Sequence, residues 1–296
     1  MAKDLIIGGA SGYKYDDVKY WINSIKKSGF EGDIALVVTN ISLNELEKIA
    51  EKGVNILAYG QKDAKGNYSS NSQMPPHVER FFHIWNYLNT TKEEYDFVIT
   101  TDVRDVVFQR NPVNFLRGDT FTGFVAAGEG LAYEDEPWGR NNYQQAFGPF
   151  FYDQIKDKEI CNVGVMAGEM SLVRDMLLMI LQLSVNRPIP IVDQAVYNFI
   201  LNTDVFKNHT EFFSNGSGWA CNLGTTLPAI ASGAGDIGQN NNPTAQIIYQ
   251  TKYMADQPVI SEDGVVYNAH DMPFYIVHQY DRVAGLADKI RTKYDD

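Results

Sequence analysis

Residues 95–112 read YDFVITTDVRDVVFQRNP, an apolar segment that leads directly into two acidic residues, Asp102 and Asp105. The run from 97 to 100 predicts a buried strand, and the residues after it predict a tight turn. In an open α/β sheet, ligands bind outside the carboxyl ends of the strands, which is where this turn lies. Hard cations such as Mg²⁺ and Mn²⁺ take carboxylate oxygens together with substrate phosphates. The stretch therefore predicts a metal site, unless Asp102 caps the turn and Asp105 pairs with Arg104 or another surface cation.

The chain before this stretch alternates between apolar runs and helical patterns. Strands are predicted at residues 4–8, 34–38 and 54–58, and the glycine-rich residues 8–12 predict a turn after the first strand. Helices are predicted after each of the first two strands, and a third follows a proline pair at residues 75–76. Strands and helices that alternate in this way form a mostly parallel sheet covered on both faces.

The second half of the chain is more irregular. Apolar spacing predicts helices over residues 172–183 and 194–201, whereas residues 224–244, rich in Gly, Ala and Asn, predict a long surface loop or lid. A strand is predicted at 274–277, with a short polar helix after Asp281. With 296 residues and 44% hydrophobic content, the chain can form one large α/β domain or two small ones, and no clear cut point divides it.

Composition excludes several classes of function. The formal net charge of −12 argues against a dedicated nucleic-acid binder and against a basic membrane-surface protein. No stretch approaches the roughly 20 apolar residues of a membrane span, so we expect a soluble chain. Cys161 and Cys221 are far apart and match no metal-binding spacing, so reduced thiols and a cytoplasmic location are expected.

Residues 95–112 resemble the D-x-D region of GT-A glycosyltransferases, in which the carboxylates bind a divalent cation and the ribose and diphosphate of a nucleotide. Two residues, instead of one, separate the carboxylates here. The resemblance implies that Asp105 ligates the metal directly, while Asp102 ligates it or contacts the ribose or a bridging water. It also implies a GT-A, Rossmann-like fold with a mostly parallel central sheet, helices on both faces and an irregular, acceptor-side C-terminal half.

Two segments before residue 95 occur in the same order along the chain as in this family. Residues 4–12 resemble the first strand and donor-binding turn, which implies that Gly8 and Ala10 lie against the nucleobase and that Tyr13 or Tyr15 stacks on it. A plain glycine turn explains the same residues. Arg80 falls where related enzymes place a basic residue that faces the donor, although a structural salt bridge would account for it too.

Two later segments resemble the retaining GT-A enzymes. Residues 162–166, Asn-Val-Gly-Val-Met, are similar to the strand that borders the sugar and acceptor pocket, which implies that Asn162 and Gly164 contact the donor. Asp193 and Gln194 resemble an Asp-Gln pair at a helix start, where the carboxylate contacts sugar hydroxyls and takes part in catalysis. The alternative is a turn glycine and an N-cap aspartate.

The C-terminal residues 275–282, YIVHQYDR, resemble the glycogenin-like retaining branch. There a histidine after a strand supplies the last metal ligand, which implies that His278 ligates the cation and that Arg282 faces the diphosphate. The lysine expected after such a histidine is not evident. Trp219, in residues 216–224, either stacks on an acceptor sugar or packs in the core.

The resemblance implies a metal-dependent glycosyltransferase with Mn²⁺ or Mg²⁺ as cofactor. Its donor would be a nucleotide-sugar, most often a UDP-sugar in this family, and its acceptor would be a carbohydrate or glycan. Residues 1–296 would form one domain, with a nucleotide-binding half at 1–115 and an acceptor-side half at 116–296. Retention of configuration is favoured. An inverting enzyme would need a carboxylate base, and the candidates lie before Trp138: Glu129, Glu134, Asp135 and Glu136.

Two other functions remain open at this point. A sugar nucleotidyltransferase would share the sheet and metal site, but its glycine-rich loop normally carries a basic residue, and residues 8–12 have none, although Lys14 is close. A non-catalytic carbohydrate-binding protein could use the same fold. The intact acidic pair and His278 argue against that alternative.

Overall fold

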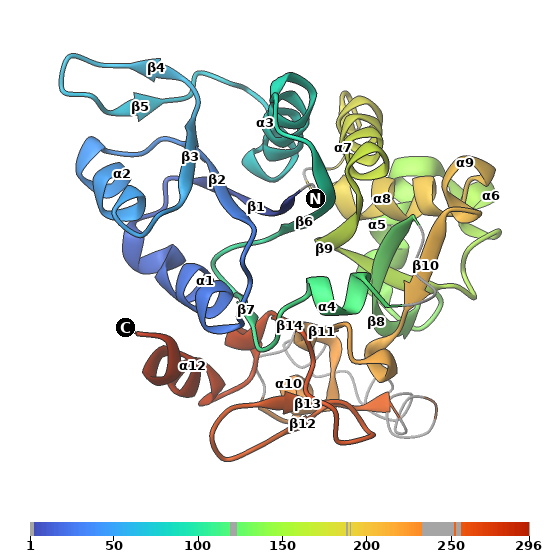
Figure 1. The fold of residues 1–296 in the computed structure, drawn as a ribbon. Coiled ribbons are helices and arrows are strands. Elements are labelled where there is room, and N and C mark those ends of the chain that lie inside the picture. The colour runs from blue at the N-terminus through green and yellow to red at the C-terminus, as the bar shows by residue number, and fades with distance from the viewer. Residues whose placement is uncertain are drawn as a thin grey trace.

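A central sheet of seven strands organises the molecule, which we describe from a computed structural model over residues 3–118, 123–187, 189, 191–232, 252 and 256–295. Its strands are β1 (Lys3–Ser11), β2 (Asp33–Thr39), β3 (Asn55–Ala58), β6 (Tyr95–Thr101), β8 (Phe124–Ala132), β9 (Glu159–Glu169) and β10 (Thr210–Phe213), in the order β10-β8-β9-β6-β1-β2-β3. Only β9 runs antiparallel to its neighbours. The predicted mostly parallel sheet is confirmed (Figure 1).

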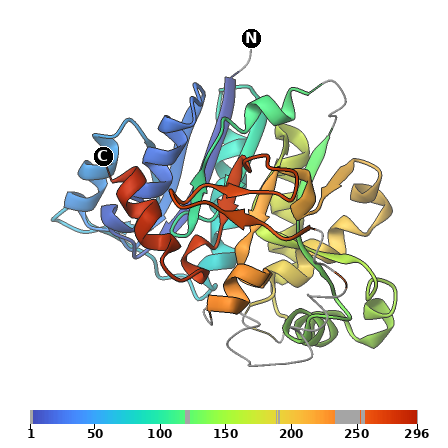
Figure 2. The ribbon, with the colours of Figure 1, turned by 90° about the horizontal axis from the view of Figure 1, so that it is seen from below.

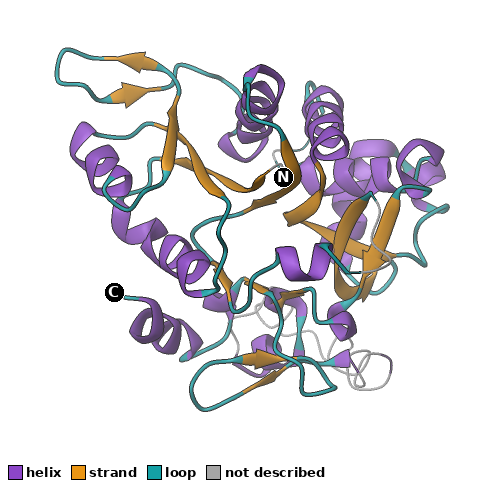
Figure 3. Cartoon of the chain, in the orientation of Figure 1, coloured by secondary structure: helices purple, strands orange, loops and turns teal. Residues whose placement is uncertain are grey.

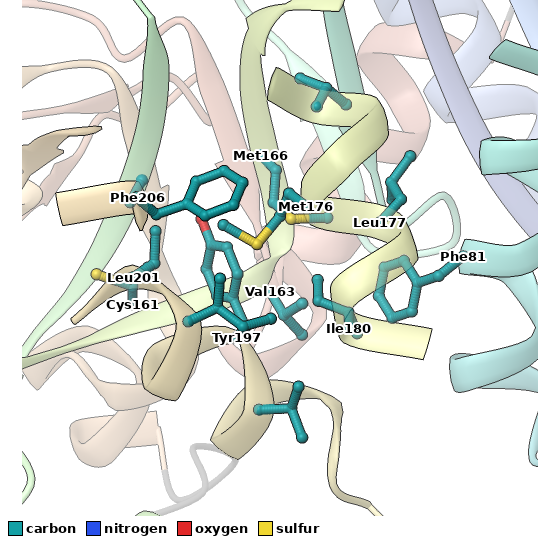
Figure 4. Packing of buried hydrophobic residues seen from close by; sticks show 14 of the residues in the cluster. Phe81, Cys161, Val163, Met166, Met176, Leu177, Ile180, Tyr197, Leu201 and Phe206 are labelled. Carbon is teal, nitrogen blue, oxygen red and sulfur yellow. The ribbon is translucent and has the colours of Figure 1, made fainter. Parts of the chain in front are cut away.

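Helices cover both faces of this sheet (Figure 3). They are α1 (Tyr15–Lys27), α2 (Leu43–Ala50), α3 (Pro76–Thr90), α4 (Val113–Leu116), α5 (Pro137–Phe147), α6 (Pro149–Tyr152), α7 (Met170–Ser184), α8 (Asp193–Leu201) and α9 (Asp204–Lys207). Because side chains alternate along a strand, Leu5 and Ile7 pack with α3, α7 and α8, whereas Ile6 packs with α1 and α2. Figure 4 shows the first of these cores between α7 and α8, around Met166 and Tyr197.

Local sequence explains where the early helices begin. Asp17 Oδ2 accepts a hydrogen bond of 2.8 Å from the backbone N–H of Lys14 at the start of α1. Ser42 Oγ accepts from the N–H of Glu45 at the start of α2, and α3 begins at Pro76, whose ring favours the first turn of a helix. These signals fix the βα units that bring the carboxyl ends of β1, β2 and β6 to one edge.

A second, three-stranded sheet contains the strand that follows β6 along the chain. It contains β7 (Val106–Phe108), β14 (Ile276–His278) and β11 (Ala220–Asn222), in the order β11-β14-β7. Strand β14 pairs antiparallel with β7 and parallel with β11, so His278 lies opposite Val106 and Asn222. Figure 2 shows the C-terminal helix α12 (Leu286–Tyr294) beside the N-terminal helices, where Asn23 Nδ2 donates to the Tyr294 carbonyl.

The prediction of a turn over residues 8–12 is wrong for most of that segment, because β1 continues to Ser11. The glycines serve close packing instead. A Cβ at Gly8 would lie 2.2 Å from Val103 Cγ1, and one at Gly9 would lie 2.7 Å from Arg80 Cβ. The chain turns only at Gly12, which has φ +72°.

Three further predictions are corrected or decided. The strand expected at 274–277 is shifted to β14, and the loop expected over 224–244 contains helix α10 (Leu227–Ser232), while residues 233–244 lie outside the described part. Trp219 is fully buried beside Phe115 and Tyr275, so it packs in the core and offers no face to a sugar.

Both cysteines are buried and free. Among the described helices, none has the length and apolar character needed to cross a bilayer.

Candidate functional site

A cavity of about 670 Å³ opens where the carboxyl ends of β1, β2 and β6 meet β9, β14 and α8. It brings together residues that are far apart in the sequence. The residues singled out from the sequence that line it are Ala10, Tyr13, Arg80, Asp102, Asp105, Asn162, Gly164, Asp193, Gln194, His278 and Arg282. Gly8 does not line the cavity, because its Cβ position faces Val103 and Trp21.

Three side chains in the cavity have the geometry of a metal-binding group. Asp102, Asp105 and His278 each offer one ligand atom, and these atoms lie within 4.8 Å of one another. His278 Nε2 is 3.4 Å from Asp102 Oδ2 and 3.9 Å from Asp105 Oδ2. Carboxylate oxygens suit Mn²⁺ and Mg²⁺, and one imidazole is compatible with Mn²⁺, so this donor set fits a divalent cation.

Backbone hydrogen bonds hold the acidic turn in place. The N–H of Asp102 donates to the Gly164 carbonyl of β9 at 2.8 Å, and the Asp105 carbonyl accepts from the N–H of Gln279 at 2.7 Å. Tyr280 Oη donates to the Arg104 carbonyl at 2.8 Å. The turn is thus tied both to the central sheet and to the segment that carries His278.

His278 is almost completely buried, with 2% of its surface exposed. Burial lowers the pKa of His278, and the carboxylate of Asp105 opposes this effect only in part. The imidazole is therefore neutral near pH 7, which is the form that ligates a metal.

Arg80 joins the acidic turn to α8. Its guanidinium forms an ion pair with the Asp102 carboxylate, and its Nη2 lies 3.8 Å from Asp193 Oδ2. The side chain is only 14% exposed. Burial lowers the pKa of Arg80, against the attraction of Asp193 and Asp105, but an arginine remains charged in proteins. Arg80 both lines the cavity and makes a salt bridge, so the two interpretations drawn from the sequence coexist.

A buried carboxylate, Glu129, holds two of the polar side chains that line the cavity. Glu129 Oε1 accepts from Asn162 Nδ2 at 2.7 Å and from Gln194 Nε2 at 3.1 Å. Asn162 Oδ1 accepts from the N–H of Gly164 at 2.7 Å. Asp193 is buried in the first turn of α8, facing Arg80. These contacts hold Asn162 and Gln194 in fixed orientations along the cavity wall.

The carboxylates considered for an inverting base lie elsewhere. Glu136 accepts from the N–H groups of Trp138 and Gly139 at the start of α5, and Glu134 and Asp135 contact Lys252. Together with Glu129, none of them lines the described cavity.

Sequence reasoning missed one residue next to the metal-binding group. Asn222 Oδ1 lies 2.9 Å from His278 Nδ1. No motif marks Asn222, and only the pairing of β11 with β14 brings it to the histidine. The one signal in the sequence is its position, since Asn222 ends a short apolar run that begins at Trp219.

Neither a family model nor a curated protein matches this sequence. Among solved structures, the chain is similar to WbbM, a bifunctional glycosyltransferase described in its apo form, with a TM-score of 0.61 and 12% sequence identity. The match covers 100% of this chain and 50% of that one, so the chain spans half the length of the WbbM structure. At this identity the likeness is one of fold: a mixed α/β, GT-A-like fold, as the sequence resemblance predicted.

Proposed function

We propose that this protein is a metal-dependent glycosyltransferase that moves a sugar from a nucleotide diphosphate donor to a hydroxyl group of a carbohydrate or glycan acceptor. One observation carries the proposal: Asp102, Asp105 and His278 converge in a cavity at the carboxyl edge of a glycosyltransferase-like sheet. Arg80 links this group to Asp193 of α8. A cation site that shares one cavity with polar side chains suits a charged leaving group and a sugar.

Asp102, Asp105 and His278 would hold Mn²⁺ or Mg²⁺. When bound, such an ion acts as a Lewis acid that offsets negative charge on the leaving diphosphate. Arg282 lies in the same cavity and would add positive charge toward the phosphates. The cation is needed because the chain has a net charge of −12 and the cavity itself holds several carboxylates.

The nucleotide would occupy the half formed by residues 1–115, where Ala10 and Tyr13 line the cavity. The sugar would lie against the half formed by residues 116–296, within reach of Asn162, Asp193 and Gln194. A buried carboxylate such as Asp193 accepts hydrogen bonds from sugar hydroxyls and stabilises the positive charge that develops at the anomeric carbon.

Retention of configuration is the outcome that these positions favour. An inverting enzyme needs a carboxylate base beside the acceptor. Glu129 is engaged with Asn162 and Gln194, and the other three candidates lie outside the cavity lining. We further propose a UDP-sugar donor, a glycogenin-like branch and a cytoplasmic location, the last because both cysteines are free.

The two alternative functions gain no support. The glycine-rich loop of a nucleotidyltransferase normally carries a basic residue, whereas residues 8–12 hold none and Gly8 and Gly9 are strand residues paired with β2. A cation site also occurs in non-catalytic carbohydrate-binding proteins, but Arg80 and Arg282 line this cavity beside the metal-binding group and suit a diphosphate, which such a protein does not bind.

The experiment is a calorimetric titration of UDP and of GDP, with and without Mn²⁺, into the wild type and into Asp105→Ala and His278→Ala. We expect UDP to bind only with Mn²⁺ and both variants to lose that binding. Asp96→Ala and His270→Ala are matched controls, because neither residue lines the cavity. If neither nucleotide binds under any condition, the proposed function is wrong.

A further inference from the structure

Asn222 is a fully buried polar residue that lies between the metal-binding group and the central sheet. It ends β11, pairs in register with His278 of β14 and has 0% of its surface exposed. Its backbone N–H donates to Asn215 Oδ1 at 3.3 Å, which fixes the main chain at this point. A buried amide needs partners for both ends of its side chain.

The orientation of the Asn222 amide follows from its partners. Asn222 Nδ2 donates to the Gly128 carbonyl of β8 at 2.8 Å and lies 3.5 Å from the Ala127 carbonyl. A carbonyl oxygen only accepts hydrogen bonds, so the NH₂ group must face β8 and Oδ1 must face the histidine.

That orientation determines which nitrogen of His278 carries the proton. Asn222 Oδ1 lies 2.9 Å from His278 Nδ1, and an amide oxygen cannot donate, so Nδ1 must be the donor. A neutral imidazole has one N–H, which leaves the lone pair on Nε2. Nε2 is the nitrogen that faces Asp102 and Asp105.

We propose that Asn222 is a positioning residue that holds His278 in the Nδ1–H tautomer and directs the Nε2 lone pair at the divalent cation. The inference rests on the proposed metal site and adds a residue to it. Partners of this kind fix the ring of a metal-ligating histidine and affect metal affinity about 10- to 100-fold when removed. Asn222 does so from a strand that contributes no ligand itself.

A purely structural role makes a different prediction, because Asn222 also ties β11 to β8. Asn222→Asp separates the two roles. The carboxylate can still accept from His278 Nδ1, but its second oxygen faces the Gly128 carbonyl and loses that hydrogen bond. If the tautomer is what matters, Asn222→Asp keeps metal affinity close to that of the wild type and Asn222→Ala does not. If the hydrogen bond to β8 matters instead, both variants lose metal affinity.

Two measurements test the proposal. The first is a long-range ¹H–¹⁵N NMR spectrum of the imidazoles in metal-free protein, in which His278→Gln identifies the signal of His278 among the five histidines. We expect the Nδ1–H tautomer in the wild type and in Asn222→Asp, and a loss of that preference in Asn222→Ala. The second is Mn²⁺ binding, followed by the EPR signal of the free ion, which we expect to weaken about 10- to 100-fold in Asn222→Ala.

Asn268→Ala is the matched control. Asn268 is equally buried, and its amide donates to the Gly216 carbonyl and accepts from the N–H groups of His270 and Met272, none of which belongs to the metal-binding group. We expect this variant to keep both the tautomer and the Mn²⁺ affinity.

The outcomes separate the inference from the proposed function. An unchanged tautomer and affinity in Asn222→Ala, or an Asn222→Asp as weak as Asn222→Ala, overturns the inference while the metal site stands. If the wild type binds no Mn²⁺, the proposed metal site is wrong. The NMR spectrum then still tests whether Asn222 sets the tautomer of His278. If Asn222→Ala does not fold, Asn222→Asp decides alone, because loss of the tautomer or of affinity in that variant contradicts the proposal.

Discussion

The backbone of Gly164 packs against the imidazole of His278, and a Cβ at position 164 would lie 2.5 Å from His278 Cε1. The same atom would lie 2.9 Å from Asp102 Oδ2, so a side chain here must displace one of the metal-binding groups. We expect Gly164→Ala to weaken Mn²⁺ binding by about 10- to 100-fold, comparable with the loss of a residue that orients a ligand. The measurement is the EPR titration, with Gly118→Ala, outside the cavity, as the control. Wild-type affinity in a folded Gly164→Ala protein would contradict this prediction.

Arg80 is a cation that stands between the carboxylates of Asp102 and Asp193. In metal-free protein, Arg80→Ala leaves these carboxylates without their shared partner, and we expect the free energy of unfolding to fall by about 2–3 kcal/mol, as for hydrogen bonds to charged groups. Saturating Mn²⁺ should reduce that loss, because a cation beside Asp102 replaces part of the missing charge. Urea unfolding with and without Mn²⁺ provides the measurement. An equal loss of unfolding free energy with and without Mn²⁺ would show that Asp102 does not bind the metal.

His83 allows the dependence of stability on pH to be predicted. Its ring stacks on Tyr59 with centroids 4.0 Å apart, and burial lowers its pKa from 6.5, with Glu79 opposing. Because the folded-state pKa is the lower one, the unfolded chain binds the proton first. The stability associated with neutral His83 is thus present above pH 6.5 and is lost as the pH falls through the folded-state pKa.

His83→Phe keeps the stacked ring and removes this titration. We therefore expect the variant to lose less stability than the wild type as the pH falls from about 7 to about 5. Urea unfolding at several pH values measures the difference, and His270→Phe, at an exposed position, serves as the control. Parallel stability curves for the wild type and His83→Phe would contradict the assignment.

Much of the fold followed from local patterns, because alternating apolar strands and helices have few other arrangements. The three-stranded sheet could not be predicted in the same way. Strands β7, β11 and β14 have three residues each, and they pair across more than half of the chain. The sequence therefore marked His278 as a metal ligand through a resemblance, while the contact between His278 and Asn222 depends on tertiary structure alone.

Glycine and tryptophan show a second limit of local reasoning. Gly8 and Gly9 were predicted as a turn because glycine marks turns, yet here the missing side chains make room for Val103 and Arg80. For Trp219 the sequence allows two interpretations, an acceptor-side surface and the core. Its packing against Phe115, which lies more than a hundred residues away, decides for the core.

Tyr197 carries a buried hydroxyl group that has no hydrogen-bond partner among the described residues. Figure 4 shows its ring close to Phe206, in the core that also contains residues of α7. Since an unsatisfied buried hydroxyl costs about 1–3 kcal/mol, we expect Tyr197→Phe to leave stability unchanged or to raise it by about 1 kcal/mol. Tyr95→Phe is the contrasting variant, because Tyr95 Oη donates to Asp33 Oδ2 at 3.1 Å and lies 2.9 Å from Tyr87 Oη. A larger stability loss in Tyr197→Phe than in Tyr95→Phe would contradict the prediction.

We expect Asp193 to act on the sugar, because it lines the cavity from α8, in the half that we propose for the sugar, and is not one of the three metal-binding residues. Asp193→Asn keeps the shape of the side chain and removes the charge that would stabilise the anomeric carbon. We expect hydrolysis of a UDP-sugar with water as acceptor to slow roughly 100-fold or more, as on loss of one electrostatic contact to a transition state. Metal-dependent affinity for UDP should stay at the wild-type level. Asp135→Asn is the matched control, since Asp135 contacts Lys252 and does not line the cavity. If Asp193→Asn instead lost UDP binding while hydrolysis at saturating donor was unchanged, Asp193 would belong to the nucleotide site rather than to the sugar.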